Sequence, residues 1–387
     1  MKILVLTDLF PTLSNPNHGI FIYQWAFHLA KMCDMTVYQV IFQEIDKPAD
    51  SNETAHFREI YPQNQPFVWI QRTQTISRFD RIWRRSRQFY RQAEMDLAQS
   101  VGEFDVIIGQ MGCPGGYAAV KLARKYGKPS IVGLRGSDVT SYLKIPILKR
   151  QAKWTYLHCD RIVTVSEDLK KQLSYLKINS EKVSVIRNGI NPIFQITDKA
   201  LSRKKLNLPD KPIILFVGYL IPRKGVKYLI NAIFKMKRHP DCQLYLIGEG
   251  DEEANLKKLT VERDMSDRVH FIGEVNQSDM VTWYNAADLF CLPSLREGIP
   301  NVMLEALACG IPVVTTDIGD NSKIINENNG VLVLPEDANL LVKAIEKTLS
   351  QKWNREVIHQ SVAGFNWEKN SNTYFETISR TIEAHLK

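Results

Sequence analysis

Several features that define common classes of enzyme and membrane protein are missing from this 387-residue chain. No apolar run approaches about 18 residues, which excludes a typical transmembrane helix. There is no D-x-D pair and no His/Cys cluster with zinc spacing, so we expect no bound divalent metal and no other cofactor. The G-x-S-x-G and G-x-x-x-x-G-K-[ST] motifs are also absent, which argues against a serine hydrolase and a P-loop nucleotide-binding protein.

Cysteine is scarce, with six residues and no C-x-x-C pair. We interpret these residues as reduced thiols in a cytoplasmic protein. The first residues, MKILVLT, combine one lysine with a short strand pattern and show no small-residue cleavage site. We therefore do not interpret them as a secretory signal.

Acidic residues are in short supply only in the first half of the chain. Residues 1–195 contain 26 Lys and Arg against 17 Asp and Glu, whereas residues 196–387 contain 24 against 25. A basic first half indicates an acidic partner, such as a membrane surface, a phosphorylated acceptor or a nucleic acid.

Six arginines and an apolar helical stripe occur together in SRFDRIWRRSRQFYRQAEMDLAQSV, residues 77–101. This pattern is typical of an ordinary surface helix. Alternatively, residues 78–91 rest on an anionic membrane surface, on the inner face of the membrane. No other stretch resembles an RNA-binding module, so we expect no nucleic-acid partner.

Strand patterns alternate with amphipathic helical stretches along nearly the whole chain. The predicted strands are residues 2–7, 35–41, 66–71, 104–109, 129–134, 161–166, 182–186, 212–218, 243–248, 268–273, 288–293, 311–316 and 330–334. Continuous apolar strands alternating with helices predict parallel sheets covered on both faces, in an α/β protein. A polar, proline-containing segment near residues 188–212 indicates a linker. We therefore predict one domain over 1–195 and a second over 196–365, with the last helix, 366–387, packing back on the first.

Two glutamates stand out in SLREGIPNVMLEALACGIPVV, residues 294–314. Glu297 lies in a loop, and we place Pro300 at the first position of a helix that ends near Cys309. Glu305 lies among apolar residues of this helix and should face the loop of Glu297. A buried carboxylate is costly without donors, so Glu305 needs partners from the protein or from a hydroxyl-rich ligand.

Further candidate sites lie in three glycine-containing stretches that follow strands. In FVGYLIPRKGVKYLINAI, residues 216–233, Arg223 and Lys224 precede a helix start. They form either an anion site or an ordinary solvated loop. LIGEGDEE (246–253) and IIGQMGCPGGYAAVKLA (107–123) lack the full dinucleotide fingerprint, so they are weak signals for NAD binding.

These stretches together resemble the retaining nucleotide-sugar glycosyltransferases with two Rossmann-like domains, often called glycosyl transferases group 1. The resemblance extends from NPNHGIFIYQWAFHLA through GLRGSDV, VIRNGIN, FVGYLIPRKG and VHFIGEV to EGIPNVMLEALACGIPVV and the final helix. Its most specific element is the E-x7-E pair, Glu297 and Glu305. The resemblance implies the GT-B fold, in which two doubly wound Rossmann-like domains face each other across a cleft.

The resemblance also implies roles for individual residues. Glu305 would hold the ribose hydroxyls of the donor, Glu297 would face the transferred sugar, and Lys224 would bind the diphosphate. Val275 would read the base through its backbone. The other implied donor-binding residues are Gly19, Gly218, Tyr219, Gly298, Ile299, Pro300, Asn301 and Val302, and the implied acceptor-side residues are His18, Ser137 and Asp138.

Two positions depart from the family pattern. Tyr219 stands where the family has arginine, and Arg223 is the candidate replacement for that cation. The HGSD motif reads RGSD, which places Arg135 at the usual histidine. An arginine there can help the leaving group, but it cannot act as a base near neutral pH.

The expected function is metal-independent, retaining transfer of a hexosyl or related group from a nucleoside-diphosphate sugar to a glycan or lipid-linked acceptor. Lys224, Arg223, Arg135 and Glu297 are the predicted catalytic residues. The alternatives are an epimerase or hydrolase of the same fold, an inactive nucleotide-sugar-binding protein, and a NAD-dependent oxidoreductase.

Overall fold

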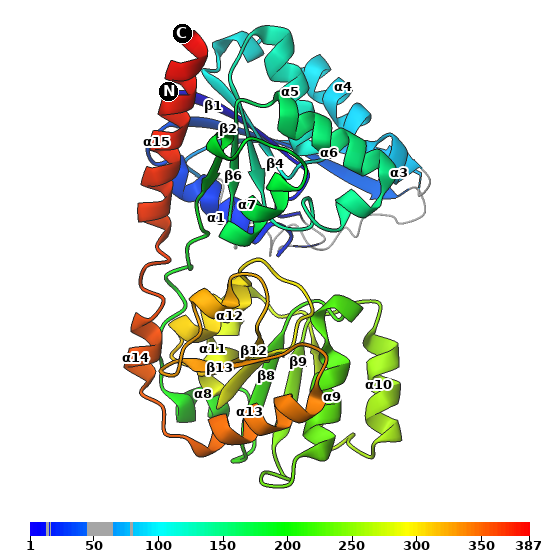
Figure 1. The fold of residues 1–387 in the computed structure, drawn as a ribbon, viewed down its shortest axis with the longest axis vertical. Helices are drawn as coiled ribbons and strands as arrows, with labels where there is room; N and C mark the ends of the chain where they lie inside the picture. The colour runs from blue at the N-terminus through cyan, green and yellow to red at the C-terminus, as the bar shows by residue number, and fades with distance from the viewer. Residues whose placement is uncertain (13–14, 16, 45–64, 78–79) are drawn as a thin grey trace. The chain divides into compact units, whose positions relative to one another are not determined.

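The computed structural model describes residues 1–12, 15, 17–44, 65–77 and 80–387 (Figure 1). It divides this part of the chain into two compact units. The first unit comprises residues 1–189 and 366–387, and the second comprises residues 190–365. The first unit thus ends at Gly189, whereas the sequence suggested a boundary at residue 195.

A parallel sheet forms the centre of the first unit. In the described residues it has seven strands in the order β3-β2-β1-β4-β5-β6-β7. Their bounds are β1 Lys2–Thr7, β2 Asp34–Glu44, β3 Val68–Ile76, β4 Val106–Gln110, β5 Ser130–Leu134, β6 Arg161–Thr164 and β7 Val183–Val185. The helices are α1 Ile20–Leu29, α3 Asp80–Trp83, α4 Arg85–Leu97, α5 Gly115–Tyr126, α6 Pro146–His158, α7 Glu167–Ser174 and α15 Trp367–Leu386.

A second parallel sheet forms the centre of the second unit. Within the described chain it has six strands in the order β10-β9-β8-β11-β12-β13. Their bounds are β8 Ile213–Val217, β9 Gln243–Ile247, β10 Val269–Gly273, β11 Leu289–Leu292, β12 Val313–Thr316 and β13 Gly330–Val333. The helices are α8 Lys199–Lys205, α9 Val226–Lys235, α10 Glu253–Glu262, α11 Gln277–Ala286, α12 Asn301–Ala308, α13 Ala338–Ser350 and α14 Arg355–Gln360.

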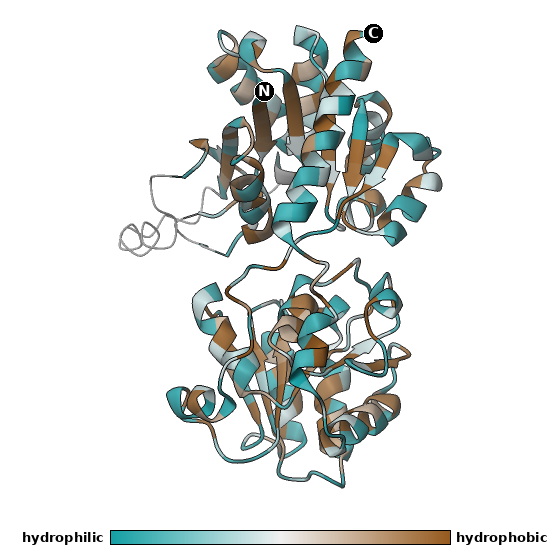
Figure 2. Cartoon of the chain, turned by 90° about the vertical axis from the view of Figure 1, so that its left-hand side faces the viewer, coloured by the Kyte–Doolittle hydropathy of each residue, from teal (hydrophilic) through white to brown (hydrophobic). Residues whose placement is uncertain are grey.

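Each predicted strand coincides with a strand of the structure, and the α/β fold with two Rossmann-like sheets is confirmed. The reason is burial on both faces. All residues of β4, β5 and β9 are buried, and a strand covered by helices on both sides is apolar along most of its length. Figure 2 shows apolar strands inside each unit and polar residues on the surrounding helices.

The last helix packs on the first unit. Trp367, Tyr374 and Ile378 of α15 are buried in the same cluster as residues of α1 and β1. The rings of Trp25 and Tyr374 meet edge to face, with centroids 5.1 Å apart. The apolar residues of α15 therefore form the face that packs on α1, as expected from the prediction that the last helix packs back on the first domain.

The arginine-rich stretch forms two helices, α3 and α4. Residues 78–79 and the side chains of residues 81 and 83 lie outside the described part. The buried side of α4 consists of Ser86, Phe89, Ala93 and Leu97. The predicted stripe had Tyr90 in place of Phe89 and included Ser86, Ala93 and Leu97. Among the described residues, every helix is too short or too polar to cross a lipid bilayer.

Candidate active site

All predicted donor residues except Gly19 belong to the second unit, and they lie at the carboxyl edge of its sheet, where the strand order reverses. Strand β8 pairs with β9 on one side and with β11 on the other. Lys224 follows β8, and Glu297 follows β11. Loops that leave neighbouring strands in opposite directions form the usual ligand crevice of doubly wound sheets. Two residues 73 positions apart are thereby brought together.

Glu297 is the centre of an ion-pair cluster. Its Oε1 accepts a hydrogen bond from Lys224 Nζ at 2.7 Å, and Arg223 Nη1 lies 3.1 Å away. The side chains of Lys224 and Glu297 are only 10% and 11% exposed. Burial alone would raise the pKa of Glu297, but the two cations outweigh it and keep this pKa below its ordinary value. The cluster therefore carries one net positive charge, which suits an anionic ligand.

The backbone fixes this cluster. Leu295 donates a backbone hydrogen bond to the carbonyl of Arg223 at 2.8 Å, which joins the two loops. Gly225 has φ +68°, and a Cβ there would lie 2.1 Å from the carbonyl oxygen of Pro293. Only glycine fits such a close approach in the left-handed region. This glycine lets α9 begin directly after Lys224.

Helix α12 follows the loop of Glu297. It spans Asn301–Ala308, close to the prediction, but Pro300 is the N-cap residue and Asn301 is the first helical residue. The side chain of the N-cap residue makes no hydrogen bond to this N-terminus. Backbone N–H groups at a helix start attract anions, so the helix adds to the positive potential near Glu297.

Glu305 finds a partner within the protein. Its Oε2 accepts a hydrogen bond from the hydroxyl of Tyr284 at 2.9 Å. Burial raises the pKa of Glu305 to about 7, although the Tyr284 hydrogen bond lowers it. The carboxylate is therefore an acceptor whose charge state changes near neutral pH.

The remaining predicted donor residues, apart from Gly19 of the first unit, lie at or near the same edge of the sheet. Gly218 and Tyr219 directly follow β8, and the ring of Tyr219 is 55% exposed. Val275 follows β10 and packs against the core of the second unit. Arg223, the candidate replacement for the missing cation, is held by Glu297 and by the carbonyl of Arg296 at 2.8 Å. Ile299 and Val302 are partly buried against the same core.

The glycines of LIGEGDEE have a packing role. A Cβ on Gly250 would lie 2.3 Å from the carbonyl oxygen of Leu220, and one on Gly248 would lie 2.2 Å from that of Gly218. These glycines let the loop after β9 pack on the loop after β8. Their spacing therefore reflects the contact between two loops, rather than a dinucleotide fingerprint.

Arg135 lies in the first unit, after β5, and is bound by uncharged groups. Its guanidinium donates to Gln110 Oε1 at 2.9 and 3.2 Å and to Asn188 Oδ1 at 2.7 Å. Burial lowers its pKa. The two side-chain acceptors are amide oxygens, which carry no net charge, so they do not neutralise the positive charge of the guanidinium.

The other acceptor-side residues of the first unit differ in accessibility. Asp138 is fully buried, and its carboxylate accepts hydrogen bonds from the backbone N–H groups of Gly112, Arg135 and Gly136. This geometry makes Asp138 the anchor of the loop after β5. Ser137 is exposed beside it.

His18 and Gly19 begin helix α1. Gly19 has φ +64°, and a Cβ there would lie 2.4 Å from the carbonyl oxygen of Leu9, so glycine is required. Burial lowers the pKa of His18, against the opposing effect of Asp8. His18 is therefore a neutral imidazole near physiological pH.

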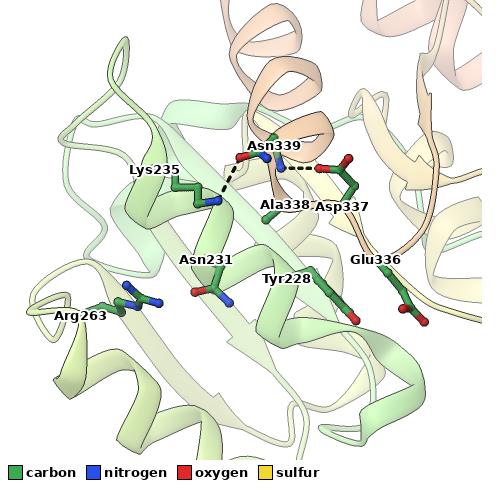
Figure 3. Close-up of a pocket in the computed structure, with 8 residues that line it drawn as sticks. All are labelled: Tyr228, Asn231, Lys235, Arg263, Glu336, Asp337, Ala338 and Asn339. Atoms are coloured by element: carbon green, nitrogen blue, oxygen red, sulfur yellow. Dashed lines mark hydrogen bonds between the residues drawn. The ribbon is translucent and has the colours of Figure 1, made fainter.

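A pocket of about 500 Å³ lies elsewhere on the second unit, between α9 and the start of α13 (Figure 3). Lys235 Nζ donates to Asn339 Oδ1 at 3.0 Å across it, and Asp337 caps the backbone of α13. No predicted site residue lines this pocket. We assign this pocket no function.

Sequence reasoning missed three polar partners in these sites: Tyr284, Gln110 and Asn188. Tyr284 belongs to an apolar stretch and resembles a core residue. Gln110 ends a buried strand, and Asn188 lies in the predicted linker. No local pattern distinguishes them, because their partners are 21 to 53 residues away in the sequence.

Comparison with known proteins supports this arrangement. The family model described as "Glycosyl transferases group 1" matches residues 198–363, and "Glycosyltransferase Family 4" matches residues 19–193. An uncharacterized glycosyltransferase of Methanocaldococcus jannaschii, MJ1607, is 34% identical over 235 residues. This match covers 58% of the chain and 60% of that relative, so the chain spans well under two thirds of its length.

Two further proteins match over almost their whole length. The putative teichuronic acid biosynthesis glycosyltransferase TuaC of Bacillus subtilis is 26% identical over 417 residues, which covers 98% of the chain and 100% of the relative. The structure of Anabaena Alr3699/HepE in complex with UDP-glucose has a TM-score of 0.76 at 17% identity, covering 98% and 100% of the two chains. At this identity the likeness is one of fold. Because the two family models adjoin and together span most of the sequence, the chain belongs to the group 1 glycosyltransferases of the GT-B fold.

Proposed function

We propose that this protein transfers a sugar from a nucleoside-diphosphate sugar to a hydroxyl acceptor, with retention of configuration and without a metal. The observation that carries this proposal is the cluster of Lys224, Arg223 and Glu297 at the reversal point of the second sheet. A nucleoside diphosphate is an anion with ribose hydroxyls. The cluster offers the positive charge, and Glu305 offers an acceptor for the hydroxyls. The Anabaena protein of the same fold is described with UDP-glucose, which supports this donor class.

In the proposed mechanism, the second unit binds the donor. Lys224, Arg223 and the start of α12 meet the charge that develops on the leaving diphosphate. Glu297 is shared by two cations, which favours a binding role over nucleophilic attack. We therefore assign no covalent intermediate, and the acceptor hydroxyl attacks from the face that the diphosphate leaves.

Thermal-shift screening tests the donor class. We expect one of UDP, GDP and ADP, or one of their sugars, to raise the melting temperature, because a ligand that binds only the folded state stabilises it. At 100 times the dissociation constant, the stabilisation should be about 2.7 kcal/mol. NAD is the control that should have no effect. If no nucleotide raises the melting temperature while NAD does, the proposal is wrong. Nucleotide release that is equally fast without an acceptor would instead indicate a hydrolase or an epimerase.

We further propose that the acceptor is lipid-linked or part of a cell-surface glycan and that the first unit faces an anionic membrane. The supporting observations are the net charge of residues 1–195 and the teichuronic acid role in the name of the relative TuaC. Arg84, which directly precedes α4, and Arg87 and Arg91 of α4 are exposed. Arg85 pairs instead with the buried Asp8 and lies over the ring of Phe42. The contact surface predicted at 78–91 therefore excludes Arg85.

Liposome sedimentation tests this surface. At low salt we expect the protein to sediment with anionic liposomes and not with neutral ones, because each exposed cation contributes about 1 kcal/mol near an anionic surface. The triple variant R84A/R87A/R91A should bind at least about tenfold more weakly. K258A, which removes an exposed cation from the second unit, is the matched control. If the unaltered protein fails to bind anionic liposomes at low salt, the membrane proposal is wrong.

A further inference from the structure

Tyr284 of α11 is fully buried, and its hydroxyl points at one acceptor. It donates to Glu305 Oε2 at 2.9 Å, across 21 residues of sequence. The ring is packed between Phe194 and Phe290, with centroid distances of 5.7 and 5.8 Å and interplanar angles of 79° and 61°. Because these contacts fix the ring, the position of the hydroxyl is set by the core of the second unit.

The hydrogen bond occupies only one of the two carboxylate oxygens. Among the described residues, Glu305 Oε1 accepts no hydrogen bond. A carboxylate held by one oxygen keeps a defined orientation. The side chain therefore loses less rotational freedom when a ligand binds the other oxygen. Neighbouring side chains of α12 are buried and apolar, including Leu304 and Ala306. They cannot replace the hydroxyl as a donor.

We propose that Tyr284 is a positioning residue for donor binding: its hydroxyl holds Glu305 Oε2 and leaves Oε1 for the ribose hydroxyls of the nucleotide. This inference rests on the proposed function, in which Glu305 binds the ribose. The inference adds that Tyr284, fixed by the aromatic residues packed on its ring, controls both the orientation and the ionisation of Glu305.

The electrostatic surroundings make Tyr284 the main group that favours the ionised carboxylate. The other titratable side chain facing Glu305 is Cys309 of the same helix, and burial raises the pKa of this thiol to about 12, so it stays neutral. Arg355 of α14 lies near Cys309, but its guanidinium donates to Thr197 O, Asn285 Oδ1 and Cys309 O. Loss of the Tyr284 hydroxyl should therefore raise the pKa of Glu305 further.

The test is Tyr284→Phe, with calorimetric titration of UDP, GDP and ADP from pH 6 to pH 9. For the tightest nucleotide, we expect affinity of the unaltered protein to rise with pH through about 7. In the variant, the midpoint of this rise in affinity should lie about one pH unit higher, because a hydrogen bond to a charged group shifts a pKa by about this amount. The variant should thus bind about fivefold more weakly at pH 7 and within about twofold of the unaltered protein at pH 9.

Three controls make the outcome decisive. Tyr245→Phe removes the hydroxyl of a largely buried tyrosine, which makes no hydrogen bond among the described residues, and it should leave the pH profile unchanged. With a 2′,3′-dideoxynucleoside diphosphate, which lacks the hydroxyls, the effect of Tyr284→Phe should disappear. In the double variant with Glu305→Gln, Tyr284→Phe should have no further effect, because it acts through Glu305.

Two results would overturn the inference. If Tyr284→Phe weakens binding equally at every pH, the hydroxyl has only a structural role; if it changes nothing, it has no role. Failure of the proposed function is recognised separately, since Glu305→Gln would then bind nucleotide as tightly as the unaltered protein. If Tyr284→Phe unfolds, the same profile is measured with Tyr284→Met, whose flexible side chain is smaller than tyrosine and carries no donor, and which should also raise the midpoint.

Discussion

Replacing Lys224 with alanine is expected to lower kcat on the order of 100-fold, with a smaller change in KM. Preorganised charges at a leaving group stabilise the transition state more than the ground state, and losing one such group commonly costs about this factor. Lys224 is suited to this role because its side chain is 10% exposed and its ammonium is held 2.7 Å from Glu297. The measurement is steady-state transfer with the donor identified by thermal shift.

Two variants accompany this prediction. Lys227→Ala removes an exposed cation one residue into the next helix and should leave kcat within about twofold. Arg223→Ala removes the second cation that pairs with Glu297. Because the side chain of Arg223 is 34% exposed, this variant should lower kcat less than Lys224→Ala does. Transfer at an unchanged rate by the Lys224 variant would remove this residue from the mechanism. A melting curve of each variant separates loss of rate from loss of fold.

Replacing Glu305 with glutamine is expected to weaken nucleotide binding while it stabilises the unliganded protein at alkaline pH. Binding should fall about 10- to 100-fold at pH 8, because a charge-assisted hydrogen bond contributes about 1.5–3 kcal/mol. Glutamine has nearly the same shape as glutamate, so the loss of affinity measures the contribution of the negative charge of Glu305.

The stabilising effect follows from the raised pKa of Glu305. Burial raises this pKa from 4.5 to about 7, so the folded state keeps a proton that the unfolded chain loses. The free energy of unfolding therefore falls as pH rises from about 4.5 to about 7, and above pH 7 the full cost of the buried charge is present. Glutamine carries no charge, so the variant should be more stable by about 3 kcal/mol at pH 8 and no different near pH 4.5.

Denaturant unfolding at the two pH values measures this difference. Glu262→Gln, which neutralises an exposed glutamate on α10, should change stability by less than about 0.5 kcal/mol at either pH. A Glu305 variant that is less stable than the unaltered protein at pH 8 would contradict the prediction. Such a result would mean that the carboxylate is stabilised in the folded state rather than strained.

The contacts between polar side chains are the part of the structure that the sequence predicted least well. The family resemblance implied that Lys224 and Glu297 bind the same donor, and the structure joins them by a hydrogen bond. Arg85 was counted with the membrane-facing arginines, yet it turns inward to Asp8, 77 residues away. Asp138 was expected to face an acceptor, yet its carboxylate is occupied by backbone N–H groups. In each case, the direction of the side chain depends on a contact that no local pattern records.

The sequence by itself determined the strands, the two parallel sheets, the glycine-dependent turns and helix α12. These features depend on local periodicity, on backbone conformation and on burial of whole segments, all of which leave a repeating pattern in the chain. Only the tertiary structure decided which polar groups meet, such as Tyr284 with Glu305 and Gln110 with Arg135. A hydrogen bond requires two atoms within about 3 Å and a favourable angle, and that geometry is set by how distant elements pack together.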